Sequence, residues 1–154
     1  MRYKLLLDTS YLLPFFGIKV KELDDRQLDA IINLQYKYTL IYPTLMVPEI
    51  VAKVSKELIK MNIKYLNDDL LMAFESLLSN TNIQLINPKV EHITLSIKLR
   101  TMGHKDIFDC IAYSTAYIEN ASFLTMDSKF VNFLKQHNFD TSFILNHNDL
   151  SAKD

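Results

Sequence analysis

The chain has 154 residues, of which 49% are apolar and 23% charged, and its formal net charge is −1. These values are typical of one globular domain spanning residues 1–154, and they exclude disordered, collagen-like and coiled-coil chains. The one cysteine, Cys110, excludes an internal disulfide and a zinc finger, and the two glycines, Gly17 and Gly103, are too few for a GxGxxG or Walker loop.

The first apolar run along the chain is short. Residues 1–7 include three consecutive leucines, but Asp8 ends the run far short of a signal peptide or a membrane-spanning segment. We therefore expect a soluble, cytoplasmic protein without membrane association.

Short apolar runs then alternate with longer helical patterns. Strands are predicted at residues 3–7, 39–42, 83–86, 123–125 and 142–145. Apolar residues spaced three or four apart predict helices at residues 25–36, 48–61, 66–78, 90–99, 107–118 and 129–137. Several of these helices have a candidate N-cap in front of them: Asp24, Asn67, Asp106, and Asp127 or Ser128.

This alternation predicts the fold class α/β, as a three-layer α/β/α arrangement around a central parallel sheet of about five strands. In such sheets, ligands bind beyond the carboxyl ends of the strands. Residues that closely follow a predicted strand are therefore the candidates for a functional site.

Two acidic residues occupy such positions early in the chain. Asp8 directly follows the first predicted strand, as either a site carboxylate or the N-cap of a helix. Glu49 lies at the start of the helix after the second strand, where a solvated pair with Lys53 is the alternative to a site role. On a helical wheel, Glu49 lies nearly opposite the expected core side, which is marked by Ile50, Val51, Val54 and Leu58.

Two further acidic residues lie in the second half of the chain. Asp109 is in the first turn of the helix at 107–118, behind Asp106 as predicted N-cap, and this position favours an anion. Small and apolar residues after Asp109 predict close packing on the sheet, which would hold the carboxylate near the strand ends. Asp127 follows the fourth strand, either as a cap of the next helix or as a site residue.

The order of these contexts resembles the PIN-domain family, and most closely the VapC-type toxins of prokaryotic toxin–antitoxin pairs. A strand followed by Asp-Thr-Ser ends at residue 10, a Glu opens the helix after the second strand, Asp-x-x-Ala-x-x-x-Ala follows at 109–116, and Leu-Thr-Met-Asp at 124–127. The resemblance covers nearly the whole chain. It implies that the catalytic and metal-binding carboxylates are Asp8, Glu49, Asp109 and Asp127. It also implies supporting roles for Ser10 or its neighbour Thr9, Thr125 and Asp106.

The resemblance implies a hydrolase, an endoribonuclease that cleaves RNA phosphodiester bonds with Mg²⁺ or Mn²⁺, ions that prefer carboxylate oxygens. It further implies a small antitoxin protein as partner and a homodimer. Two alternatives stay open: a housekeeping PIN nuclease in RNA maturation, and a non-catalytic α/β binding module whose acids are caps and surface charges. Ser10 argues against a haloacid dehalogenase, which needs a second Asp there, and Asn87-Pro88 after the third strand argues against a receiver domain.

The basic residues and the histidines complete the set of candidates. Lys53, Lys56 and Lys60 lie on one stripe of the helix at 48–61, which predicts either a row that binds RNA phosphates or a solvated helix face. The histidines share no metal-ligand spacing, and we expect all of them on the surface: His92, His104, His137 and His147.

Overall fold

A computed structural model describes residues 3–150, and the ends of the predicted domain lie outside this range. Five parallel strands form one sheet in the order β3-β2-β1-β4-β5. The strands are β1 (Lys4–Leu7), β2 (Thr39–Pro43), β3 (Gln84–Ile86), β4 (Ser122–Leu124) and β5 (Ile144–Leu145). The predicted parallel sheet of about five strands is thus confirmed.

The central strand β1 is buried on both faces. Leu5 pairs with Leu40 of β2 on one side and with Ser122 of β4 on the other. Leu5, Leu6 and Leu7 are all fully buried, as the unbroken leucine run predicts for a strand covered by helices on both sides. The residue that follows β1 is therefore fixed near the middle of the sheet edge.

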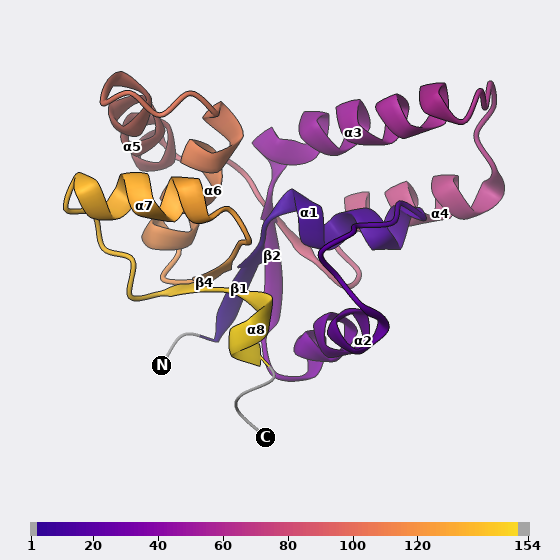
Figure 1. Cartoon of the computed structure of the whole chain (residues 1–154), viewed down its shortest axis with the longest axis horizontal. Helices are drawn as coiled ribbons and strands as arrows, with labels where there is room; N and C mark the ends of the chain where they lie inside the picture. The colour runs from indigo at the N-terminus through magenta and orange to yellow at the C-terminus, as the bar shows by residue number, and fades with distance from the viewer. Residues whose placement is uncertain (1–2, 151–154) are drawn as a thin grey trace.

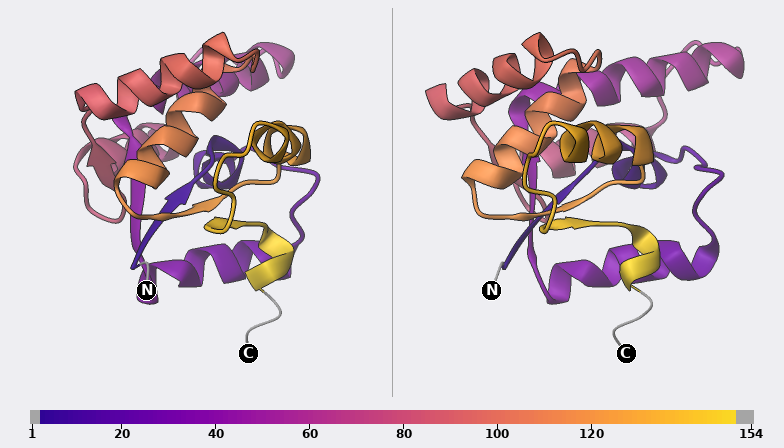
Figure 2. Two further views of the ribbon diagram at one scale, coloured as in Figure 1. Left: turned by 90° about the vertical axis from the view of Figure 1, so that its left-hand side faces the viewer. Right: turned by 60° about the vertical axis from the view of Figure 1, so that its left-hand side comes forward.

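Helices cover both faces of this sheet. They are α1 (Thr9–Leu12), α2 (Asp25–Asn33), α3 (Val47–Lys60), α4 (Asp68–Leu78), α5 (Val90–Thr101), α6 (Ile107–Ile118), α7 (Ser128–Gln136) and α8 (His147–Leu150). Figure 2 shows α5, α6 and α7 on one side of the sheet and α2 with α8 on the other, while α3 and α4 extend to the right in Figure 1. The three-layer α/β/α class is confirmed. Across residues 3–150, no helix is long and apolar enough to cross a membrane.

Most helix boundaries follow from the sequence. The side chains of Asp24, Asn67, Asp106 and Asp127 cap α2, α4, α6 and α7 by accepting from backbone N–H groups of the first turn. The helix predicted at 25–36 divides into α2 and a 3₁₀ turn, Leu34–Tyr36. The short helix α1 agrees with the alternative of Asp8 as the N-cap of a helix. The four-residue helix α8 was not predicted, because about one turn of helix leaves no apolar periodicity to detect.

Asparagine ends several helices in this glycine-poor chain. Asn62, Asn80, Asn120 and Asn138 all have φ between 52° and 59°, and each lies just beyond a helix end. After α6, the chain turns at Asn120, so that the N–H of Ala121 bonds the carbonyl of Ala116 at 2.8 Å. This left-handed position favours Gly or Asn, so asparagine performs the role that glycine has in most proteins.

Helix α6 packs directly against the sheet, as its small residues predict. Cys110, Ala112 and Ala116 are fully buried, and the Cys110 thiol is free, with its pKa raised by burial to about 11. Ala112 and Ala116 let the helix backbone approach the strands closely. The start of α6 is thereby held near the carboxyl end of the sheet.

The expected surface position of His92 is wrong. This side chain is 3% exposed. Its Nδ1 accepts from the N–H of Lys89 at 3.0 Å, and its Nε2 lies 3.3 Å from Glu119 Oε1. Glu119 also pairs with Lys4 and Lys89. His92 therefore belongs to a polar cluster that ties α5 and α6 to β1.

Candidate active site

The first predicted acid, Asp8, lies buried at the carboxyl end of the sheet. Its N–H bonds the carbonyl of Leu124 in β4 at 3.0 Å, which continues the pairing of the strands. Its Oδ1 accepts from the N–H of Thr9 at 2.8 Å, and its Oδ2 accepts from the Thr125 hydroxyl at 2.7 Å. Asp8 is thus both the N-cap of α1 and a carboxylate fixed between the ends of β1 and β4.

Glu49 lies close to Asp8 and does not point into solvent. Its side chain is 13% exposed, its Oε1 is 2.9 Å from Lys53 Nζ, and its Oε2 accepts from the Thr9 hydroxyl. The wheel-based expectation is wrong in one respect, because Val51 is about half exposed, so the core side of α3 is narrower than its apolar residues suggest. The pair with Lys53 does form, on a carboxylate that is held inward by α1.

A hydroxyl pair connects Glu49 to the second strand. Thr9 Oγ1 is 2.7 Å from the Tyr42 hydroxyl, and Tyr42 also lies 3.1 Å from the carbonyl of Met46. Since the single Thr9 proton goes to Glu49, the Tyr42 proton is shared between Thr9 Oγ1 and the Met46 carbonyl. Thr9 therefore carries the contacts expected of Ser10 or Thr9. In residues 3–150, the Ser10 hydroxyl, which is half-buried, makes no hydrogen bond to a protein group.

The start of α6 supplies two acids with different partners. Asp106 caps the helix and accepts from the N–H of Phe108 at 2.8 Å and from that of Asp109 at 3.4 Å. The Asp109 side chain is 13% exposed, and its Oδ2 lies 2.7 Å from Nε2 of His104. His104, expected on the surface, is instead mostly buried and bonded to a candidate site residue.

Asp127 lies at the start of α7, after β4. Its Oδ1 accepts from the N–H of Phe130 at 2.9 Å, and its own N–H bonds Thr125 Oγ1 at 3.2 Å. Thr125 therefore bonds both Asp8 and Asp127, and it spaces the two acids along one edge. In Figure 1, the starts of α3, α6 and α7 gather above the carboxyl end of the sheet.

Electrostatics connect all four predicted carboxylates. Burial raises the pKa of Asp109 to about 8, and repulsion from Asp106, Asp8, Asp127 and Glu49 adds to the shift. Burial also raises the pKa of Asp8, and Glu49 adds to this shift. Without a cation, Asp109 is therefore mostly protonated at neutral pH.

The pKa of His104 shifts in the opposite direction. Burial lowers the pKa of His104, although Asp106 and Asp127 act to raise it. At neutral pH the contact between His104 and Asp109 is thus a hydrogen bond between neutral groups rather than an ion pair.

The donor set fits a hard divalent cation. Carboxylate and hydroxyl oxygens surround the site, and a cation would relieve the repulsion that adds to the effect of burial on the pKa of Asp109. Within residues 3–150, however, no three His, Cys, Asp or Glu side chains are already arranged around one point as metal ligands. The acidic oxygens are instead held by Thr9, Thr125, Lys53, His104 and the amide of Phe130.

The lysine stripe runs away from this site along α3. Lys53 pairs with Glu49, Lys56 is exposed, and Lys60 pairs with Glu57 at 2.7 Å. Among these three lysines, Lys53 alone therefore pairs with one of the four predicted carboxylates.

Sequence reasoning missed two contributors to the site. Tyr42 is the penultimate residue of β2, so its place near the carboxyl end of the sheet was a signal available in the sequence. His104 lies two residues before the N-cap Asp106, and no pattern of spacing identifies its contact with Asp109. That contact depends on how the turn between α5 and α6 folds back.

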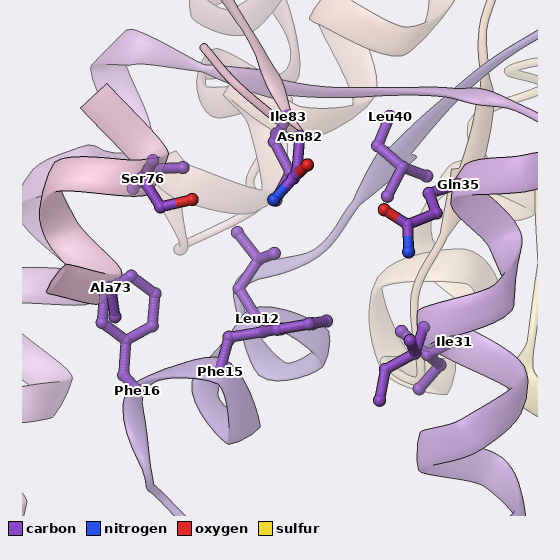
Figure 3. Close-up of a pocket in the computed structure, with 12 residues that line it drawn as sticks. Leu12, Phe15, Phe16, Ile31, Gln35, Leu40, Ala73, Ser76, Asn82 and Ile83 are labelled. Carbon is purple, nitrogen blue, oxygen red and sulfur yellow. The ribbon is translucent and has the colours of Figure 1, made fainter. Parts of the chain in front are cut away.

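A separate apolar cleft lies on the other side of α1. Its volume is about 270 Å³, and Figure 3 shows side chains from α1, α2, α4 and the neighbouring segments facing it. Its lining includes Leu12, Phe15, Ile31, Ile32 and Ile83, with Gln35 and Asn82 as polar members. None of the four predicted carboxylates lines this cleft.

Comparison with solved structures gives the same fold. VapBC2 from Rickettsia felis, bound to a DNA fragment from its promoter, matches with a TM-score of 0.59 at 17% identity, over 93% of this chain and 98% of that chain. PAE2754 from Pyrobaculum aerophilum matches with a TM-score of 0.56 at 15% identity, over 97% and 90% of the two chains. No curated protein sequence matches the chain.

The family assignment rests on the sequence match. PIN domains are generally nucleases that use divalent metal ions, and the PIN domain family model matches residues 5–134, most of the chain. The chain therefore belongs to the PIN-domain family.

Proposed function

We propose that this protein is an endoribonuclease that hydrolyses RNA phosphodiester bonds with Mg²⁺ or Mn²⁺, as the cytoplasmic toxin of a toxin–antitoxin pair. The observation that carries the proposal is the grouping of four carboxylates from separate elements, where burial, and after it the charges of the neighbouring acids, raise the pKa of Asp109 to about 8. A binding module with acids serving only as caps has no need to bury and concentrate them in this way. Charge concentration of this kind is typical of functional sites.

In this proposal, Asp8, Asp109, Asp127 and Glu49 would hold the cation. When bound, the ion would activate water for attack and stabilise the charge that develops at phosphorus. Asp109 would release its proton to solvent on contributing an oxygen, and Thr125 and Thr9 would keep Asp8 and Glu49 oriented. Lys53, at the end of the stripe nearest the acids, would bind a phosphate of the RNA.

RNA cleavage by the wild type and by Asp109→Asn tests the proposal, in Mg²⁺, Mn²⁺ and chelator. We expect cleavage by the wild type with either ion, none with chelator, and at least a hundredfold loss in the variant. Asp25→Asn is the matched control, since Asp25 also lies in the first turn of a helix but is exposed on α2. Undiminished cleavage by Asp109→Asn, or by the wild type in chelator, contradicts the proposal.

A protein partner is supported by the apolar cleft and by the similar structure. The matching VapBC2 structure is a complex bound to promoter DNA. We propose that an antitoxin encoded by a small neighbouring reading frame inserts apolar side chains into the cleft lined by Leu12, Phe15 and Ile31. A housekeeping nuclease, the alternative, would have no such neighbouring gene.

A charge placed in the cleft tests this partner. Ile32→Arg should abolish antitoxin binding, measured by calorimetry, and leave RNA cleavage intact. Ile59→Arg is the control, because Ile59 is exposed on α3 outside the cleft lining. Equal binding by both variants would place the antitoxin elsewhere. We also propose that the single-domain chains form a homodimer. Light scattering on the same samples should then give twice the mass of one chain.

A further inference from the structure

His104 is held in place by three segments of the chain. It lies in the turn between α5 and α6, directly after Gly103, whose φ of +114° is readily adopted only by glycine. Arg100 Nη1 donates to the carbonyl of His104 at 2.8 Å. The imidazole packs against Phe130 and Phe133 of α7, with ring centroids 4.4 and 5.0 Å away. The ring therefore has little freedom to turn.

The fixed ring presents Nε2 to one oxygen of Asp109. The distance from Nε2 to Oδ2 is 2.7 Å, and both side chains are about 15% exposed or less. An ionised carboxylate can only accept hydrogen bonds, so Nε2 must carry the proton when Asp109 is charged. Within residues 3–150, no protein donor bonds the other oxygen, Oδ1. The nearby helix amides are already taken by Asp106.

We propose that His104 is a positioning residue, which holds Oδ2 of Asp109 through Nε2–H and leaves Oδ1 free to bind the catalytic cation. This inference rests on the proposed function of the same site. A hydrogen bond to the oxygen that does not bind the ion fixes the orientation of a ligand, and loss of such bonds commonly weakens metal binding 10- to 100-fold.

Two substitutions separate the hydrogen bond from the packing. His104→Phe keeps an aromatic ring against Phe130 and Phe133 but has no donor, whereas His104→Gln keeps an N–H near the position of Nε2. We expect calorimetry on the full chain to give a Kd for Mn²⁺ about tenfold weaker in His104→Phe, and within about threefold of wild type in His104→Gln.

Controls distinguish positioning from a general loss of structure. His137→Phe should leave the Mn²⁺ affinity unchanged, because the His137 ring also packs against Phe133 but bonds only the Phe133 carbonyl of the preceding helix. Thermal unfolding without metal checks the fold of each variant. If His104→Phe does not fold, His104→Met supplies a flexible side chain without a donor.

The outcomes for His104 and for the proposed function are distinct. Wild-type Mn²⁺ affinity in the donor-free variant overturns the positioning role, and so does an equal loss of affinity in His104→Gln. If Asp109→Asn loses Mn²⁺ in the same experiment, the proposed function still stands. If the wild type neither binds Mn²⁺ nor cleaves RNA, both the proposed function and the role of His104 are overturned.

Discussion

Asp109 shows how burial changes the behaviour of a single carboxyl group. It lies in the first turn of α6, where the helix dipole favours an anion, yet its pKa is raised to about 8 by burial and by the surrounding acids. The desolvation and repulsion therefore outweigh the dipole. This balance gives Asp109 a measurable effect on stability.

Stability without metal should fall as pH rises because of Asp109. At pH 5, Asp109 keeps its proton in the folded protein and releases it in the unfolded chain. Above about pH 8, Asp109 is ionised in both states, and the folded protein is destabilised by the buried charge and by its repulsion from the other acids. Asp109→Asn should therefore raise the free energy of unfolding by about 1–3 kcal/mol at pH 8 and much less at pH 5. Urea unfolding in chelator at the two pH values measures this.

The matched variant Asp25→Asn should show no such pH dependence, since Asp25 is exposed on α2. If Asp109→Asn is less stable than wild type at pH 8, the carboxylate serves the helix start rather than a cation site.

For single residues, the sequence predicted where an acidic side chain lies better than it predicted which groups that side chain contacts. The place of Asp8 followed from its strand, because a residue after a buried central strand cannot move far from the sheet. The inward orientation of Glu49 could not be predicted from the wheel of its own helix, since it depends on Thr9 of another element. The contact of His104 with Asp109 depends equally on tertiary packing.

At the scale of elements, the helix ends follow from local chemistry. Asn120 adopts a φ of 52° beyond α6 and is exposed, so its backbone conformation rather than its side-chain packing explains its place. Asn120→Ala should lower the free energy of unfolding by about 1 kcal/mol, and Asn120→Gly should leave it unchanged or raise it slightly.

Chemical denaturation of both variants measures this difference. Asn132→Ala, at an exposed position inside α7, is the control and should not destabilise the protein, because alanine favours helix. Equal stability of Asn120→Ala and Asn120→Gly would show that the left-handed conformation imposes no cost.

The lysine stripe on α3 is the second feature that belongs to an element. Lys53→Ala combined with Lys56→Ala should raise KM for RNA and flatten the salt dependence by about one to two units of log–log slope. Stability should change by less than about 0.5 kcal/mol, since Lys56 is exposed and the Lys53 side chain, although paired with Glu49, is 39% exposed.

Cleavage kinetics over a series of salt concentrations test this. Lys37→Ala is the control, because Lys37 is exposed just before β2. It therefore lies at the amino ends of the strands, whereas the acids lie at the carboxyl ends. Unchanged KM and salt slope in the double variant would leave the stripe as a solvated helix face.

The sequence predicted the long helices and the strands better than the short helices. Long amphipathic helices and apolar strands were found because their periodicity extends over several turns or residues. The short helices α1 and α8 are set by tertiary contacts, such as the bond between the Tyr11 hydroxyl and His147. The cleft beside α1 could not be predicted for the same reason, because its walls come from separate elements.

At the scale of the whole molecule, the parallel sheet brings distant acids to one edge. The strands β1 and β4 both end at that side of the sheet, so residues more than a hundred positions apart, such as Asp8 and Thr125, share a hydrogen bond. This topology follows from the order of strands and helices in the sequence, and the grouping of the acids follows from the topology. We expect the grouped carboxylates to bind a divalent cation.

Anomalous diffraction from crystals soaked in MnCl₂ tests that claim most directly. We expect a manganese peak contacted by the carboxylates of Asp8 and Asp109, at the carboxyl end of the sheet, that disappears in crystals of Asp109→Asn. Manganese bound only away from these carboxylates, or an unchanged peak in the variant, would contradict it.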